Sequence, residues 1–359
     1  MTLLDVAGAR VDVAIAGGGI IGLSAALELA AAGLRVAVYE RGQAMHESSW
    51  AAAGMLAADD PENPALLKLL SRLSIRLYPE FLARVEALSG EKIPIRTTRT
   101  LQGSSHLPDG YDPLSVTELA KLAPGLHSGP YNFFSLDEQS FDPRDLVLAL
   151  PKAVRAAGVT LYEQTTVTAI HSGHGQVELE TSAGPIIAKH FINAAGAWAA
   201  QLTSSLPVEP RKGQMLSVEL SGPTQLACVL RTPELYIVPR GLGRYIIGAT
   251  VEDAAFDKSV QPEAIHQLLA DASALWPPLK QAQIVEAWAG LRPGTADHLP
   301  MIGSDGPNCW LATGHFRNGI LLAPATARIM RELITGSETS IDLAPFRCDR
   351  FAAASVHSS

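Results

Sequence analysis

The N-terminal part of the chain has the clearest pattern of apolar and polar segments. Residues 11–16 are mostly β-branched or otherwise apolar, which predicts a strand buried on both faces. A helical pattern over residues 23–32 follows a glycine-rich turn and ends at Gly33. Residues 35–39 predict a second strand, and Glu40 comes directly after it. Strand, helix and strand within about 30 residues predict one βαβ unit with parallel strands.

Apolar residues recur at helical spacing in later segments of the chain. We interpret the leucine-rich stripe between residues 61 and 88 as core packing. The segment 142–157 has Asp142 as its N-cap, Pro143 in its first turn and Gly158 after its end, so both termini of this helix are predicted. The predicted helices after the first are 61–88, 115–122, 142–157, 262–275 and 320–334.

Short apolar runs between these helices predict further strands. The run 309–313 leads through Gly314 into the C-terminal helix, so the order of strand, glycine turn and helix occurs at both ends of the chain. The predicted strands are 159–162, 167–171, 177–181, 186–193, 214–220, 235–239, 244–249 and 309–313.

These elements predict an α/β fold of two domains. We expect a GxGxxG dinucleotide-binding, Rossmann-like domain assembled from the discontinuous segments 1–85, 140–208 and 288–359. A β-rich α+β domain made of residues 86–139 and 209–287 would hold the substrate.

Composition excludes several classes of protein. The chain has 359 residues, of which 47% are hydrophobic, so it is long enough for two domains with a large core. The net charge is −8 and the basic residues form no dense run, which argues against a nucleic acid or an anionic membrane as partner. No apolar run approaches the roughly 20 residues of a membrane span. Asp5 and Arg10 interrupt any signal-peptide pattern, and three cysteines without CxxC spacing favour a reducing cytoplasm over a disulfide framework or a zinc site.

The turn after the first strand has the spacing of a dinucleotide fingerprint, Gly17-x-Gly19-x-x-Gly22. Gly17 allows the tight turn, Gly19 lets the backbone approach a pyrophosphate, and Gly22 lets the helix pack close to the strand. The helix N-terminus presents free N–H groups to the phosphate. Glu40 suits ribose hydroxyls, and its charge argues against a 2′-phosphate. The motif predicts a bound dinucleotide but does not distinguish FAD from NAD.

The C-terminal glycine turn, 314–319, is the second candidate for chemistry. A helix N-terminus at this turn would stabilise negative charge at the N1 and O2 side of a reduced flavin. The alternative is a helix that only docks on the sheet. His315 in this turn is a candidate base, with a structural hydrogen bond as the alternative.

Arg292 and Tyr236 are the candidates for substrate binding. We expect Arg292 in a rigid loop between glycines and a proline, where its guanidinium suits a carboxylate; a surface salt bridge is the alternative. Tyr236 in a strand could donate a second hydrogen bond, or could simply belong to the core. The sequence contains nothing that resembles a Ser-His-Asp triad, a paired-carboxylate site or a metal cluster.

Together these segments resemble the FAD-dependent amine oxidases of the D-amino-acid oxidase superfamily, and within it the bacterial glycine oxidase family. The resemblance covers nearly the whole chain. The segments that carry it are 17–22, 51–55, 236–240, 248–250, 288–295 and 314–326.

The resemblance implies oxidative deamination of glycine or another small amino acid, with oxygen as the acceptor and hydrogen peroxide as a product. It also implies a link to thiamine biosynthesis and a homotetramer. Arg292 would bind the substrate carboxylate with help from Tyr236 and Arg317. A dehydrogenase that passes electrons to a quinone or a carrier protein is the alternative.

The same resemblance assigns residues to FAD. Covalent relatives use a cysteine near the loop of Arg292, and none occurs there, so we expect non-covalent FAD. The implied cofactor residues are Gly17, Gly19, Ile20, Ile21, Gly22, Glu40, Arg41, Ser48, Ser49, Ala53, Gly54, Met55, Val167, Gly196, His315, Phe316, Arg317, Asn318, Gly319, Ile320 and Leu321.

Three positions depart from the pattern of the resembled family. Val251 stands where a methionine is expected, Glu234 replaces a histidine, and Trp50 replaces a small residue. These departures bear on the size of the substrate and on which amino acid the protein prefers.

Overall fold

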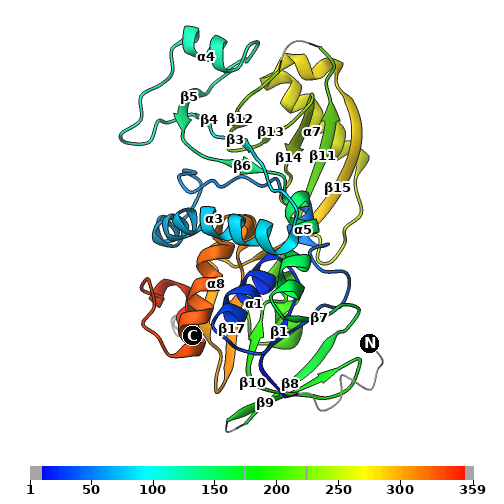
Figure 1. Cartoon of the computed structure of the whole chain (residues 1–359). Helices are drawn as coiled ribbons and strands as arrows, with labels where there is room; N and C mark the ends of the chain where they lie inside the picture. Colours follow the sequence, from blue (N-terminus) through cyan, green and yellow to red (C-terminus); the bar gives the residue numbers. More distant parts are fainter. Residues whose placement is uncertain (1–9, 174, 223–224, 352–359) are drawn as a thin grey trace, which may run out of the picture.

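The computed structural model describes residues 10–173, 175–222 and 225–351, and its first layer is an eight-stranded sheet (Figure 1). Strands β17, β10, β1, β2 and β7 are parallel neighbours, and β16 pairs antiparallel with β17. Strands β9 and β8 extend the sheet from β10. The predicted α/β fold and the first βαβ unit are confirmed. The bounds are β1 Arg10–Ala16, β2 Val36–Tyr39, β7 Thr160–Tyr162, β8 Val167–Gly173, β9 Gln176–Thr181, β10 Ile186–Asn193, β16 Met301–Ser304 and β17 Cys309–Thr313.

Four helices pack with this sheet in the largest hydrophobic core of the molecule. The stripe between residues 61 and 88 forms a single long helix, α3, which follows a 3-10 turn and ends at the left-handed Gly90. Asp142 caps α5 as predicted, since its carboxylate accepts a hydrogen bond from the backbone N–H of Arg144. The bounds are α1 Ile20–Ala31, α3 Lys68–Ser89, α5 Pro143–Ala156 and α8 Gly319–Thr335.

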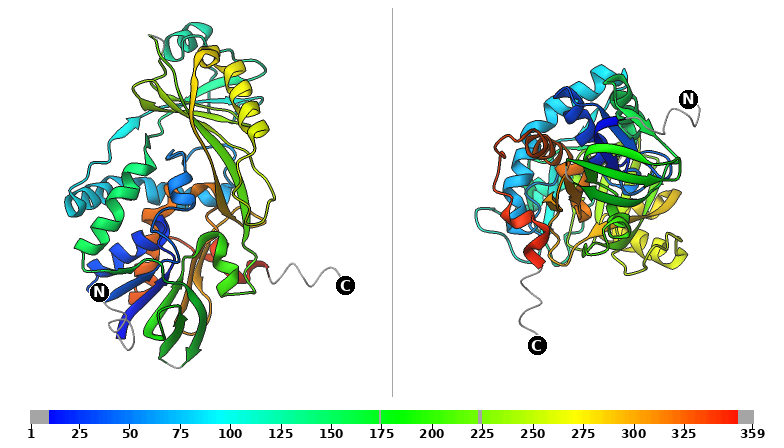
Figure 2. Two further views of the ribbon diagram at one scale, coloured as in Figure 1. Left: turned by 90° about the vertical axis from the view of Figure 1, so that its right-hand side faces the viewer. Right: turned by 90° about the horizontal axis from the view of Figure 1, so that it is seen from below.

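A seven-stranded sheet forms the second layer, with the strand order β15-β11-β14-β13-β12-β4-β5. The helix α7 packs against this sheet, and α7 and β1 lie at opposite ends of the molecule in Figure 1 and in the left view of Figure 2. The strands β3 and β6 form a separate two-stranded sheet. Along the chain, each of them occurs where the chain passes from one large sheet to the other. The bounds are β3 Ile95–Thr97, β4 Thr100–Ser104, β5 Asn132–Leu136, β6 Ser140–Phe141, β11 Glu209–Glu219, β12 Val229–Arg231, β13 Tyr236–Gly241, β14 Arg244–Gly248, β15 Gln283–Gly294, α4 Val116–Leu122 and α7 Pro262–Leu275.

Arg292 lies in a strand, so its predicted position in a loop is wrong. β15 pairs with β11 along its whole length, and the pairing continues through Pro293 to Gly294. Proline is tolerated there because β15 is the edge strand, whose outer side needs no N–H donor. The expected domain boundary at residue 288 therefore falls inside a strand, and the division into domains stays a prediction. No helix in the described ranges is both long and apolar enough to cross a bilayer.

Candidate active site

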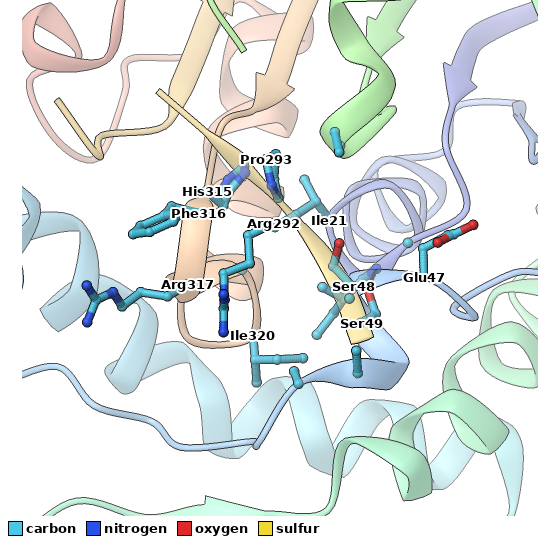
Figure 3. Close-up of a pocket in the computed structure, with 18 of the residues that line it drawn as sticks. Ile21, Glu47, Ser48, Ser49, Arg292, Pro293, His315, Phe316, Arg317 and Ile320 are labelled. Atoms are coloured by element: carbon cyan, nitrogen blue, oxygen red, sulfur yellow. Dashed lines mark hydrogen bonds between the residues drawn. The ribbon is translucent and has the colours of Figure 1, made fainter. Parts of the chain in front are cut away.

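A cavity of about 530 Å³ lies between the two sheets, at the carboxyl ends of β1, β10 and β17. Ligands of α/β proteins bind at this end of a parallel sheet because loops and helix N-termini converge there. Figure 3 shows Arg292 from β15 together with His315, Phe316 and Arg317 from the segment before α8. Except for Gly22 and Leu321, all the residues that we expected to bind cofactor or substrate line this cavity.

The glycine turn after β1 has the geometry that a dinucleotide needs. A methyl group on Gly17 would overlap the carbonyl oxygen of Ala194, and its φ of 107° favours glycine. A methyl group on Gly22 would overlap the carbonyl of Gly17, so Gly22 permits the close packing of α1 rather than contact with a ligand. Gly19 faces the cavity, and the nearest atom to an added methyl group there is Oγ of Ser49, at 3.4 Å.

Polar side chains hold this turn in place. Glu40 accepts hydrogen bonds from the N–H groups of Gly18 and Gly42, each at 2.8 Å, which fixes its carboxylate beside the turn. Ser49 Oγ accepts a 3.0 Å hydrogen bond from the N–H of Ile20 in the first turn of α1. The open Gly19 position, the helix N-terminus and the carboxylate of Glu40 fit the pyrophosphate and ribose of a dinucleotide.

The C-terminal turn after β17 supplies a further part of the cavity wall. His315 is buried and its Nε2 lies 3.0 Å from Oγ1 of Thr326. Burial lowers the pKa of His315 to about 3, so the imidazole is neutral and the structural hydrogen bond is favoured over a role as base. Leu321, in the first turn of α8, packs in the hydrophobic core and does not line the cavity.

Arg292 and Tyr236 lie side by side, although β11 and β14 separate their strands in the second sheet. Nη1 of Arg292 donates a 3.0 Å hydrogen bond to the carbonyl of Thr250, which orients the guanidinium. The hydroxyl of Tyr236 interacts with this guanidinium. Burial raises the pKa of Tyr236 and the neighbouring Arg292 cation partly opposes that shift, so the phenol stays protonated and can donate. Two adjacent donors suit one carboxylate.

The three departures from the resembled pattern lie in different places. Trp50 does not line the cavity; its ring contacts that of Trp288, and the guanidinium of Arg144 lies over both, with its Cζ 3.9 Å from the ring centroid of Trp50. Glu234 lines the cavity and accepts a 2.6 Å hydrogen bond from Tyr131 Oη. Val251 also lines it and is exposed.

Several residues of the cavity wall were not predicted. Met215, Trp198 and Arg231 belong to segments without a recognisable motif. Arg231 forms a buried ion pair with Glu138, with its Nη1 3.0 Å from Oε2. Strand register alone could have indicated Arg231, because it lies directly opposite Tyr236 on the neighbouring strand.

Comparison with known proteins identifies the family of this chain. The model of the FAD dependent oxidoreductase family (DAO) matches residues 12–333. A glycine oxidase of Geobacillus kaustophilus is 35% identical, with 95% of this chain and 97% of the relative covered. A bifunctional ThiO/ThiG protein of a Nostoc species is 36% identical over 94% of this chain, which spans 55% of that relative. The crystal structure of glycine oxidase from Geobacillus kaustophilus superposes with a TM-score of 0.90 at 33% identity, covering 95% of this chain and 99% of that one.

The family match spans most of the chain, and the cavity has the turn, carboxylate and helix terminus that a dinucleotide requires. The resemblance drawn from the sequence is therefore confirmed, with FAD as the cofactor. The chain belongs to the family of FAD-dependent oxidoreductases.

Proposed function

We propose that this protein oxidises glycine or another small amino acid, such as sarcosine or a small D-amino acid, with oxygen as the electron acceptor. For an amino acid with a primary amine, such as glycine, the products are a 2-oxoacid, ammonia and hydrogen peroxide; sarcosine would release methylamine in place of ammonia. The observation that carries the proposal is the pair of donors, Arg292 and Tyr236, in the same cavity as the dinucleotide turn. The glycine oxidases among the relatives support the same substrate class.

Arg292 and Tyr236 position the substrate. The guanidinium forms charge-assisted hydrogen bonds with the carboxylate, and the phenol donates one more. Holding the carboxylate at two points restricts the orientation of the Cα–H bond, which is how positioning lowers the barrier. Bound FAD supplies the chemistry by accepting a hydride from Cα. Arg317 is exposed at the cavity wall and adds a second positive charge on the carboxylate side.

No protein base is required for this step. The lone pair of the neutral amine assists the departure of hydride, so the substrate nitrogen takes the role that a base would have. His315 is neutral and already hydrogen-bonded to Thr326, which is consistent with a structural role. The imine that results then hydrolyses in water.

FAD is expected to bind without a covalent link. Cys228, Cys309 and Cys348 all lie in the described part of the chain, and none of them lines the cavity. Mass spectrometry after acid denaturation tests this, because a covalent flavin would increase the mass of the protein.

The experiment that tests the reaction is anaerobic reduction of the bound flavin by glycine, sarcosine, D-alanine and D-proline, followed by admission of air. Fast bleaching by glycine or sarcosine, with rapid recovery and release of peroxide, is expected. Bleaching without fast recovery would favour the alternative, a dehydrogenase with a quinone or a carrier protein as acceptor. No bleaching by any member of the panel would contradict the proposed substrate class.

The ThiO/ThiG relative supports a role in thiamine biosynthesis for this chain. A strain that lacks the protein should then grow poorly without thiamine and recover when thiamine is added. Normal growth without thiamine would favour a role in amino-acid catabolism.

A further inference from the structure

Met215 and Tyr236 meet over a glycine in the middle of the second sheet. Met215 on β11 lies opposite Gly248 on β14, and Gly248 lies opposite Tyr236 on β13. Because Gly248 has no side chain, the two flanking side chains come together above it, and a methyl group at this position would lie 2.5 Å from Tyr236 Oη. The phenol donates a hydrogen bond to Sδ of Met215, with 2.7 Å between the two atoms.

Met215 is a wall residue of the cavity in which the reaction is proposed to occur. Its side chain is only 4% exposed, but it lines the cavity and otherwise packs among apolar side chains. The chain has six methionines. Among those in the described ranges, Met55 also lines the cavity, whereas Met45, Met301 and Met330 are buried in the cores.

We propose that Met215 is a site of oxidation by hydrogen peroxide, and that the resulting sulfoxide captures the hydroxyl of Tyr236 and weakens substrate binding. The inference rests on the proposed function for the source of peroxide inside the protein. It makes the methionine a feedback site through which the product of the reaction slows further turnover.

Oxidation of Met215 consumes one molecule of hydrogen peroxide and releases one molecule of water. A lone pair of the Met215 sulfur attacks one oxygen of hydrogen peroxide, a sulfur–oxygen bond forms, and the oxygen–oxygen bond breaks. Sulfur loses two electrons and the peroxide gains them; the departing oxygen leaves as water after taking up the proton of the attacked oxygen. The hydroxyl of Tyr236, adjacent to the sulfur, can donate a hydrogen bond to the departing oxygen.

The sulfoxide and the thioether of Met215 differ in how strongly they accept the hydrogen bond from Tyr236. A thioether is a weak acceptor, so a substrate carboxylate competes with it easily for the phenol. A sulfoxide is polar and its oxygen is a stronger acceptor, so it retains the phenol against the carboxylate. Loss of one neutral hydrogen bond to the substrate is expected to raise KM roughly 3- to 10-fold. Arg292 still binds the carboxylate, so kcat should change less than KM.

The test uses the FAD-loaded protein, treated with hydrogen peroxide in the absence of substrate. Oxidation is mapped by peptide mass spectrometry at every methionine, and KM is measured after the peroxide is removed. We expect one added oxygen at Met215 well before any at Met45, Met301 and Met330, together with the rise in KM. Oxidation of those buried methionines at the same rate as Met215, or an unmodified Met215, would overturn the inference.

Two variants separate the sulfoxide from general damage. Met215→Leu keeps an apolar side chain without sulfur, so its KM after peroxide should equal its own KM before treatment. Met55→Leu is the matched control at the other methionine of the wall, and it should still show the rise in KM. The same rise in Met215→Leu as in the unaltered protein would overturn the inference.

A third measurement separates this inference from the proposed function. The protein is allowed to turn over glycine in air, with and without catalase. Oxidation of Met215 that catalase prevents supports both proposals. If added peroxide oxidises Met215 but turnover in air releases no peroxide, the sensitivity of Met215 to peroxide stands, whereas its role as a feedback site and oxygen as the acceptor are both contradicted.

Discussion

The guanidinium of Arg292 lies directly over the backbone of Gly213: a methyl group on this glycine would overlap Nη1, Nη2 and Cζ of the arginine. The two residues lie on the neighbouring strands β11 and β15, where Arg292 itself is opposite Arg211. The glycine therefore provides the space in which the arginine reaches the cavity.

The first prediction concerns this space. Gly213→Ala should raise KM about 10-fold or more, because the displaced guanidinium loses charge-assisted hydrogen bonds to the substrate. The overlap is with the end of a flexible side chain, so the melting temperature and the flavin spectrum should change little. Gly173→Ala is the matched control: its added methyl group would lie 3.7 Å from the nearest atom and should alter neither KM nor stability. An unchanged KM in Gly213→Ala would contradict the proposed role of Arg292.

The second prediction concerns the shape of the cation. Arg292→Ala should raise KM and lower kcat/KM by about 10- to 100-fold, which corresponds to the loss of hydrogen bonds to a charged group. Arg292→Lys should recover only part of this, since an ammonium group cannot form the planar two-point contact. Steady-state kinetics with glycine measures both. A near-normal kcat/KM in Arg292→Ala would refute the assignment of this residue.

The third prediction concerns retention of FAD. The segment 251–261 leaves the second sheet and reaches residues of the nucleotide-binding side: the ring of Phe256 stacks on Trp198 with centroids 5.6 Å apart, and Lys258 Nζ lies 3.0 Å from Glu47 Oε2. Trp198 and Glu47 both line the cavity. Phe256→Ala should therefore release FAD about 3- to 10-fold faster, because an aromatic pair contributes about 0.5–1.5 kcal/mol.

Release is measured from the recovery of flavin fluorescence on dilution. The control for this loop variant is Leu242→Ala, which removes an apolar side chain that is 96% exposed. Equal release rates in Phe256→Ala, Leu242→Ala and the unaltered protein would show that the stacked pair does not retain the cofactor.

The fourth prediction follows from the depressed pKa of His315. The folded protein holds this imidazole neutral down to a pKa of about 3, whereas the unfolded chain binds a proton near the ordinary value of about 6.5. The unfolded state therefore binds more protons between these values, and the stabilising contribution of a neutral His315 is lost as pH falls through this window. The difference in unfolding free energy between the unaltered protein and His315→Gln should shrink on acidification.

Denaturant unfolding at several pH values measures this difference. Carboxylates titrate in the same range in both proteins, so their effect cancels in the comparison. A difference that is independent of pH between about 7 and 4 would contradict a neutral, buried His315. The pH dependence of kcat should likewise contain no inflection from His315 near neutrality.

Short-range features of the chain were predictable from the sequence. The first βαβ unit and the cap of α5 form within about 30 residues, so local patterns of apolar residues, glycines and caps determine them. The dinucleotide turn is similar, because Gly17 and Gly22 are required by backbone conformation and close packing that the motif itself encodes. The other expected cofactor residues came from the resemblance to the family and stay predictions.

Contacts across the second sheet were not predictable in this way. The glycines and the proline around Arg292 indicate a loop, but pairing with β11 makes the segment an edge strand. Arg231 and Met215 carry no motif and enter the cavity wall because of strand register. The partners of Met215 and Arg292 lie more than 20 residues away in the chain, and periodicity within one segment does not specify such partners.

By itself, the sequence determined the class of fold, the cofactor turn and the identity of the cation expected to bind the substrate. Only the tertiary structure decided that Arg292 lies over Gly213, that Met215 lies against the hydroxyl of Tyr236, and that Trp50 is not part of the cavity wall. The physical reason is the range of the interactions: backbone conformation and helix capping act between near neighbours, whereas the wall of the cavity is made by side chains that strand pairing and packing bring together.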